Sequence, residues 1–223
     1  MALLLVCGVL KFPGLAATEF SADSLLQAWL AASTNLSSFQ ANLIQTRHLK
    51  ALTQPLTSTG KVWFAAPNYF RWELGSPPQS IALRSGETLL ILSPRMRRAE
   101  SYPLGGAASG PAKDLMGLLD AAFPRSLDEF KKQFEVTGVS THEEVLELKM
   151  VPRSPMGRKM MPSLTVELVA GSFQLRSTEM TFADGSRLRN EFSGMITNQP
   201  ISEDLFRTNL DASWKTTRGG ISP

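Results

Sequence analysis

Residues 60–94 read GKVWFAAPNYFRWELGSPPQSIALRSGETLLILSP, and the pattern of this stretch decides the fold. Short apolar runs alternate with turn residues, which predicts four strands joined as a β-meander. Phe70, Trp72 and Leu74 share one face of the second strand, because successive side chains of a strand point to opposite faces. Residues 89–92 are apolar on both faces. This pattern indicates a sheet that is covered on both sides, and one of those covers is a candidate for a ligand.

A helix and a long strand are predicted before this meander. Residues 21–36 place leucines and Trp29 at helical spacing, with Ser21 or Asp23 available as a cap. We therefore expect an amphipathic helix of about four turns. Residues 37–49 have extended character, and residues 53–58 form a polar connection into the meander.

Helices interrupt the strands after the meander. Residues 95–102 have the low apolar content of a rim strand, and residues 104–111 form a Gly-rich loop. Two short amphipathic helices follow, at residues 113–123 and, from a capping-box spacing, at residues 126–132. Inserted helices beside such a loop are candidates for a movable lid, although a static cover is as common. The apolar stripe of this lid includes Leu115, Met116, Leu119 and Phe123.

Extended character returns at residue 134 and persists almost to the end of the chain. The dipeptide Asp184-Gly185 predicts a hairpin tip. Residues 151–162 are expected to form a long hairpin loop, whose methionines and basic residues suit either a docking surface or a plain exposed tip. Residues 201–206 are expected to form a final turn and strand, and the chain from residue 215 onward a frayed end.

Together these patterns predict a mainly β fold with added α-helices. We count about eleven strands in one nearly continuous antiparallel meander. A sheet of that size must curl or close. The fold class that follows is an antiparallel β-barrel with a helical cover.

Length and composition indicate one globular domain. The chain has 223 residues, of which 43% are hydrophobic and 19% charged. These values exclude a disordered protein, and all-β units of about 200 to 250 residues often form a single domain. The formal net charge of +3 is not gathered into a basic run, so a nucleic-acid partner is not expected.

The first residues predict export. Residues 1–10 are almost wholly apolar and are followed by Leu15-Ala16-Ala17-Thr18, a small-residue pattern that signal peptidase reads. The apolar run is too short to span a bilayer as a helix. No Lys or Arg precedes it, and a buried N-terminal element is the alternative. We expect a signal peptide at residues 1–17, cleaved near Ala17, and a single mature domain at residues 18–223.

Cleavage near Ala17 would leave a mature chain without cysteine. Cys7 is the only cysteine and lies within the predicted signal peptide, where Val6 before it disfavours lipidation. A mature chain without a thiol has no disulfide, no thiolate catalysis and no cysteine metal site.

Catalytic chemistry is poorly supported. The two histidines, His48 and His142, stand in no recognisable catalytic motif. The chain contains no HExxH, CxxC, GxGxxG or P-loop pattern, so no enzyme activity, metal or cofactor is predicted. The apolar face of the meander has two interpretations, the core of a β-sandwich or the wall of a cavity closed by helices, and composition does not decide between them.

Several motifs resemble the LolA family of periplasmic lipoprotein carriers. The resemblance covers nearly the whole mature chain, in the family's order, through motifs of moderate specificity. The motifs are Phe39-Gln40-Ala41 followed by Gln45, GKVWF at 60–64, PNYFRW at 67–72, PQSI at 78–81, SGETL at 85–89 ending at Pro94, MTFADG at 180–185, Asn198, and Leu205-Phe206.

The resemblance implies a half-open barrel whose helices form a lid over an apolar cavity for acyl chains. On this basis the lipid-binding cavity is expected to include Val62, Phe64, Phe70, Trp72, Leu74, Ile81, Leu83, Leu90 and Leu92. Many family members have an arginine before Pro67 that holds the lid shut, whereas this chain has Ala66 there. Arg71 is the candidate for a replacement latch.

The function implied is that of a non-enzymatic periplasmic carrier, without cofactor and acting as a monomer. Its expected partners are lipoprotein or lipid acyl chains, an inner-membrane donor complex and an outer-membrane acceptor. Two alternatives stay open at this point. One is a sensory or regulatory lipid-binding domain of the same fold, and the other is an envelope lipid hydrolase.

Overall fold

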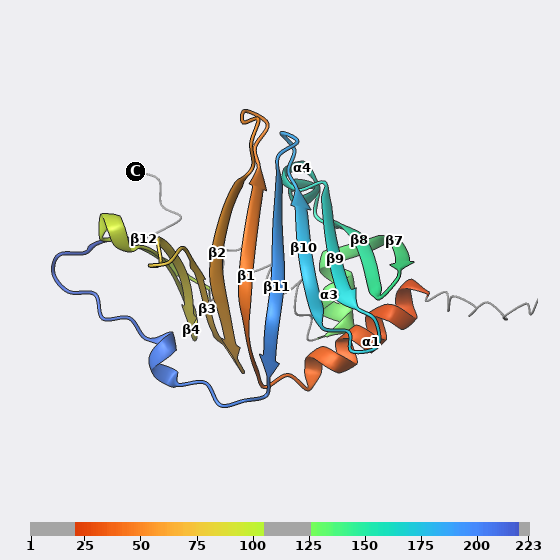
Figure 1. Ribbon diagram of the computed structural model, residues 1–223, viewed down its shortest axis with the longest axis horizontal. Helices are drawn as coiled ribbons and strands as arrows, with labels where there is room; N and C mark the ends of the chain where they lie inside the picture. The colour runs from red at the N-terminus through yellow and green to blue at the C-terminus, as the bar shows by residue number, and fades with distance from the viewer. Residues whose placement is uncertain (1–20, 105–125, 219–223) are drawn as a thin grey trace, which may run out of the picture.

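The computed structural model describes residues 21–104 and 126–218 (Figure 1). The predicted signal peptide, and the predicted lid helix with Leu115, Met116, Leu119 and Phe123, lie outside the described residues.

Within these described residues, twelve strands form a single sheet that does not close, in the order β12-β6-β5-β4-β3-β2-β1-β11-β10-β9-β8-β7. All neighbouring strands are antiparallel except β12 and β6, which are parallel. The mainly β, half-open architecture is thus confirmed. The strands are β1 (Ser38–His48), β2 (Leu56–Ala65), β3 (Tyr69–Leu74), β4 (Ser80–Ser85), β5 (Thr88–Ser93), β6 (Arg98–Pro103), β7 (Phe134–His142), β8 (Val145–Pro152), β9 (Ser163–Val169), β10 (Leu175–Thr181), β11 (Arg187–Thr197) and β12 (Lys215–Arg218).

Two meanders meet at the centre of this sheet. Strands β1 to β6 lie side by side in chain order, and so do β7 to β11. The long strands β1 and β11 join the halves, pairing from Phe39 opposite Thr197 to His48 opposite Arg187 (Figure 1). The fold therefore depends on this long pairing between segments about 150 residues apart and on the short pairing of β12 with β6, in addition to local hairpins.

The helices begin at hydroxyl caps, as the sequence predicts. The side chain of Ser21 accepts a hydrogen bond from the Ser24 N–H and starts α1 (Ala22–Thr34). Ser126 does the same for the Glu129 N–H at the start of α3 (Leu127–Gln133). Figure 1 shows both helices on the β7–β10 side of the sheet.

Four short elements differ from the expectations. The hairpin loop between β8 and β9 contains a helix, α4 (Pro155–Met160), because Ser154 caps it and proline suits its first turn. The expected strand at 201–206 is a 3-10 helix, η2 (Glu203–Phe206), and a second one, η1 (Pro94–Met96), precedes β6. The expected frayed end contains β12, which pairs with β6.

The core lies mainly on one face of the sheet, which we call the inner face. Leu25, Leu26 and Trp29 of α1 are buried against it. The Trp29 ring meets the ring of Phe130 of α3 edge-on, with centroids 6.0 Å apart. Both helices thus close the inner face at the β7 side.

The opposite face, called here the outer face, is also partly covered. Residues 199–214, which we call the C-terminal segment, run from β11 to β12 and carry η2 across β3 and β4. Phe206 is buried there among side chains of β4 to β6, and its ring lies 5.4 Å from that of Tyr69. The C-terminal segment is therefore one of the two covers of the sheet that the apolar pattern of residues 89–92 predicts.

Candidate functional site

The strand register places five of the nine predicted cavity residues together. Val62 stands opposite Trp72, and Phe64 opposite Phe70, so these side chains share the inner face. The five residues pack in or against the same core cluster as α1, and they are Val62, Phe64, Phe70, Trp72 and Leu74.

The other four residues are on the outer face, so the expectation of one common surface is wrong. Leu83 stands opposite Arg71, and Ile81 opposite Glu73, which are outer-face residues of β3. Leu90 and Leu92 continue that face on β5. Ile81, Leu83, Leu90 and Leu92 pack with Phe206 of the C-terminal segment.

The physical reason differs between the two strands. On β4 the alternation is clear, but its apolar residues Ile81 and Leu83 pack against the C-terminal segment and not against the helices. On β5 both faces are apolar, so alternation alone does not show which residues face the helices. Trp72 on β3 stands opposite Ala82 on β4, and Ala82 stands opposite Ile91 on β5. Leu89 and Ile91 are therefore the inner-face residues of β5, and they pack in a small separate cluster.

Aromatic rings dominate the inner face of β1 to β3. The rings of Phe39 and Phe64 are stacked 5.5 Å apart, and Trp72 meets Phe192 of β11 edge-on at 5.9 Å. Phe70 is only 6% exposed, whereas Phe64, Trp72 and Leu74 are half-buried. The inner face thus has a closed core portion and a partly accessible apolar portion.

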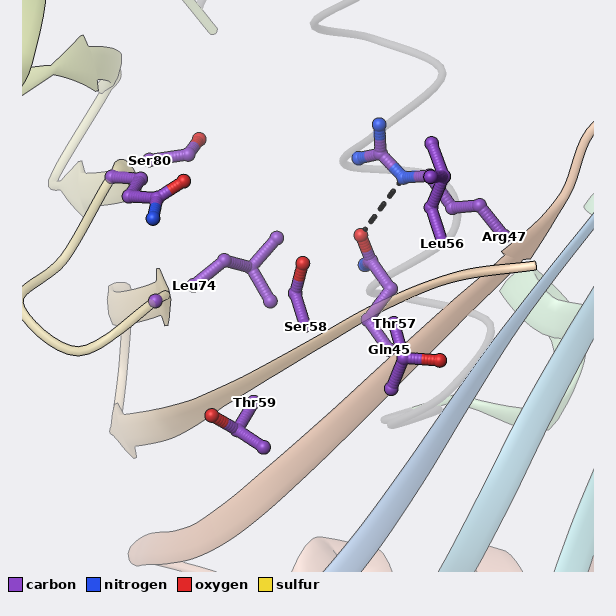
Figure 2. Close-up of a pocket in the computed structure, with 10 residues that line it drawn as sticks. Gln45, Arg47, Leu56, Thr57, Ser58, Thr59, Leu74 and Ser80 are labelled. Carbon is purple, nitrogen blue, oxygen red and sulfur yellow. Dashed lines mark hydrogen bonds between the residues drawn. The ribbon is translucent and has the colours of Figure 1, made fainter. Parts of the chain in front are cut away.

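A pocket of about 460 Å³ adjoins the accessible portion, near the β1–β2 hairpin (Figure 2). It forms where β2 runs past β3, since β3 pairs with β2 only from Gly60 onward. Its volume is within the usual range of about 300 to 1,000 Å³ for small-molecule sites. The lining residues are Gln45, Arg47, Leu56, Thr57, Ser58, Thr59, Leu74, Gly75, Gln79 and Ser80.

A chain of hydrogen bonds runs from this pocket into the inner face. The Nε atom of Arg47 donates to Gln45 Oε1 at 3.0 Å, and Gln45 Nε2 donates to Asn190 Oδ1 at 2.9 Å. Asn190 Nδ2 then donates to Thr178 Oγ1 at 3.2 Å. Because arginine only donates, it determines the orientation of both amides. Within the described residues no buried side-chain nitrogen or oxygen lacks a partner.

Sequence reasoning missed Arg47, Asn190 and Thr178 and used Gln45 only as part of a motif. The signal was present for β1, because Gln45 and Arg47 continue the alternation of Phe39, Ala41 and Leu43 onto the inner face.

Among the described residues, Arg71 bonds to the C-terminal segment and not to α1 or α3, and because the predicted lid helix lies outside the described residues its role as a latch stays a prediction. Arg71 lies on the outer face, where its Nε donates to Glu73 Oε1 at 2.6 Å and its Nη1 donates to the Leu205 carbonyl at 2.9 Å. Both charged side chains are mostly buried, with 16% and 17% exposed. Arg71 therefore fastens the C-terminal segment. Ala66 is exposed in the β2–β3 turn, where its N–H donates to the Ser37 carbonyl at 2.8 Å.

Replacement of Arg71 by methionine is expected to loosen the C-terminal segment. Methionine keeps an apolar stem but leaves the buried Glu73 carboxylate without its cation, at a cost of about 1 to 3 kcal/mol. Hydrogen exchange should show faster exchange of amides in residues 199–214 than in the wild type. The matched variant Arg207→Met, which removes an exposed arginine from the same segment, should leave these rates unchanged. Unchanged exchange in Arg71→Met would contradict the fastening role.

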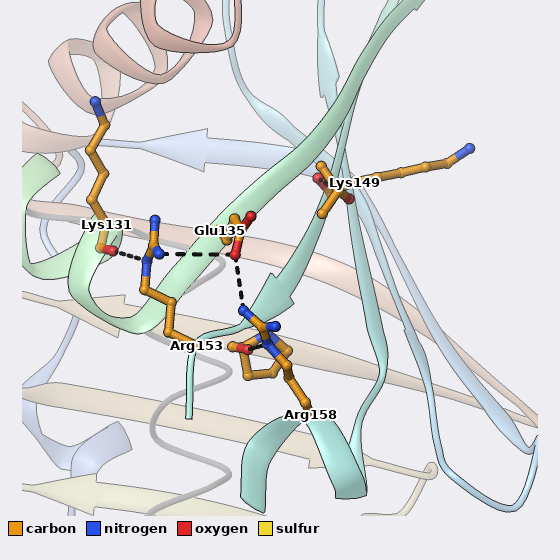
Figure 3. Close-up of polar contacts among 7 residues, drawn as sticks. Lys131, Glu135, Lys149, Arg153 and Arg158 are labelled. Atoms are coloured by element: carbon orange, nitrogen blue, oxygen red, sulfur yellow. Dashed lines mark hydrogen bonds and ion pairs between the residues drawn. The ribbon is translucent and has the colours of Figure 1, made fainter. Parts of the chain in front are cut away.

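The two arginines of the β8–β9 loop also have structural partners (Figure 3). Arg158 Nη2 contacts Glu135 Oε2 at 2.9 Å, and its Nε donates to the Pro152 carbonyl at 2.6 Å. Arg153 Nε donates to the Lys131 carbonyl at 2.6 Å. These bonds tie the loop to α3 and β7. Met156 and Met160 of α4 are left 66% and 53% exposed.

The perturbed titratable groups belong to structural pairs. Hydrogen bonds from Arg189 and Ser177 hold the pKa of Glu167 below its usual value, despite its partial burial. The Glu100 carboxylate accepts a bond from Tyr102 and raises the pKa of that phenol. Among residues 21–104 and 126–218, no group of His, Cys, Asp and Glu side chains suits a metal ion. Across the same residues, no helix has the length and apolar character needed to cross a membrane.

Comparisons with known proteins agree on one family. The model of the family described as outer membrane lipoprotein carrier protein LolA matches residues 34–209. The chain is 28% identical over 201 residues to an outer-membrane lipoprotein carrier protein of Coxiella burnetii (strain CbuK_Q154), covering 84% of this chain and 87% of the relative. It is 29% identical over 152 residues to one of Cupriavidus taiwanensis, covering 68% of this chain and 66% of that protein.

A solved structure shares the fold. An uncharacterized conserved protein from Thermus thermophilus superposes with a TM-score of 0.53 at 11% identity, covering 88% of this chain and 99% of that one.

Proposed function

Since the chain belongs to the LolA family of outer-membrane lipoprotein carriers, which are non-enzymatic transport proteins, we propose that it carries acylated cargo between membranes. The acyl chains of a lipoprotein, or of another lipid, lie on the accessible part of the inner face during transfer. The single observation that supports this most is the half-buried apolar surface of Phe64, Trp72 and Leu74 beside a pocket.

A carrier needs this kind of partly open surface. Burial of an acyl chain of about fourteen methylenes gains roughly 11 kcal/mol relative to water, at about 0.8 kcal/mol per methylene. A membrane offers the same chain a similar gain, so the net preference for protein or membrane is small. The direction of cargo transfer must then be set by partner proteins that bind the loaded and the empty carrier with different affinities.

The proposal includes where and with whom the protein acts. It works in the periplasm as a monomer, after removal of residues 1–17, and exchanges cargo with an inner-membrane donor complex and an outer-membrane acceptor. The family membership supports this setting, because the matched relatives carry the name of outer-membrane lipoprotein carriers.

Native mass spectrometry of the protein purified from its own periplasm tests the proposal. We expect an intact mass that begins near Thr18 and a fraction of molecules with a lipid or lipoprotein adduct. A fluorescent fatty-acid probe should bind the delipidated protein and be displaced by the extracted cargo. Recovery without any adduct, together with no probe binding, would reject the carrier function.

The same experiment separates the alternatives. Stable lipid occupancy with no transfer to acceptor vesicles or partner proteins would favour a sensory domain of this fold. Turnover of the bound lipid ester would instead favour a hydrolase.

A further inference from the structure

The pocket near the β1–β2 hairpin has a chemical character that the apolar inner face does not explain. Leu74 belongs both to this pocket and to the accessible apolar surface, while Thr57, Ser58 and Ser80 contribute hydroxyl groups to the lining. Figure 2 shows Arg47 on one side and Leu74 on another side of this space. A ligand that fills both regions would have an apolar chain and a polar end.

Among the described residues that line the pocket, Arg47 is the only one with a formal charge. Its guanidinium forms no ion pair with a carboxylate of the described residues. Such an arginine is suited to a carboxylate or phosphate, which its two terminal nitrogens can bind in a bidentate manner.

The position of this arginine is determined by buried partners. Its Nε donates to Gln45, which is 6% exposed and which in turn donates to Asn190, 4% exposed. Aligned hydrogen bonds in a low-dielectric region polarise one another. Only the Nε atom of Arg47 takes part in this series of hydrogen bonds, so its two terminal nitrogens can bind a ligand.

We propose that this pocket binds the anionic end of an amphiphile whose acyl chain lies along Leu74 and Trp72. The group recognised is a carboxylate or phosphate, as in a fatty acid or a phospholipid. The inference rests on the proposed carrier function and specifies its cargo, because a carrier with this pocket prefers an anionic lipid to a neutral one of the same chain length.

Competition binding tests this preference. A fluorescent acyl probe is displaced from the delipidated protein by lauric acid, dodecyl phosphate, methyl laurate or dodecanol. We expect an anionic ligand to bind about 10-fold more tightly than its neutral counterpart, since hydrogen bonds to charged groups are the strong ones. The preference should weaken as salt is added, because Arg47 is exposed to solvent.

Arg47→Gln should bring the ratio of anionic to neutral affinity to about one, and Arg47→Lys should leave an intermediate ratio. The matched control is Lys61→Gln, which removes a cation from the outer face of the neighbouring strand. It should keep the wild-type ratio. Circular dichroism and urea unfolding establish that each variant folds.

The outcomes separate the two proposals. If methyl laurate binds the wild type but the acid and the phosphate bind no better, the anionic pocket is rejected and the carrier function stands. If the ratio survives in Arg47→Gln, this pocket is likewise rejected. If none of the four ligands binds, both proposals fail. Whichever anion binds more tightly identifies the source, fatty acid or phospholipid.

Discussion

Substitution of Trp72 by glutamate is expected to weaken fatty-acid probe binding by about 100-fold or more, because a carboxylate on the acyl-binding surface costs several kcal/mol of desolvation. Trp72 is half-buried on the inner face, and its ring lies 6.0 Å from Phe70 and 5.9 Å from Phe192. A glutamate there reaches solvent in the empty protein, so folding is preserved. Fluorescence titration with the probe measures the effect.

The matched control is Ile44→Glu. Ile44 is 42% exposed on the outer face of β1, so the same charge is added to an apolar site on the wrong side of the sheet. Probe binding should stay at the wild-type level. Equal losses in both variants would reject the inner face as the binding surface. Phe70 is a poorer choice for this test, because it is 6% exposed and a glutamate there would be buried without a partner.

Replacement of Trp29 by alanine is expected to lower the free energy of unfolding by about 3 to 5 kcal/mol. Trp29 is 1% exposed and is the largest side chain by which α1 packs against the sheet. Its removal leaves a cavity between α1 and Phe130 that the surrounding strands cannot fill. Urea unfolding monitored by circular dichroism measures the loss.

Gln27→Ala is the control for this substitution. Gln27 is exposed on the opposite side of α1, so its replacement should change the free energy of unfolding by less than about 0.5 kcal/mol. A loss under about 1 kcal/mol for Trp29→Ala would show that α1 is not a structural part of the inner face.

The sequence predicts the strands of this fold better than it predicts the site. On β3 the alternation is unambiguous, since Phe70, Trp72 and Leu74 are apolar and Arg71 and Glu73 are not, and the structure places the first three on the inner face. On β5 both parities are apolar, and the expectation selected Leu90 and Leu92, which belong to the outer face. Local pattern indicates a face only when the two faces differ in polarity.

The pocket could not be predicted from local sequence patterns, because the residues that bond to each other there are far apart in the chain. Gln45 and Arg47 are two residues apart, but the buried acceptor of the Gln45 amide is Asn190, 145 positions along the chain from Gln45. The role of Arg71 in fastening the C-terminal segment likewise depends on the carbonyl of Leu205, 134 positions away. No sequence motif links Asn190 to Gln45 or Leu205 to Arg71.

By itself the sequence determined most of the antiparallel strands and the caps of α1 and α3, because alternation, turn residues and hydroxyl caps act over a few neighbouring residues. Its motifs also indicated the family of carriers. Only the tertiary structure decided which apolar face meets the helices, that the C-terminal segment covers the other, and that Arg47 lines a pocket while Arg71 fastens that segment. The physical reason is that burial depends on what packs against a strand from far along the chain, and the pairing of β1 with β11 brings those distant segments together.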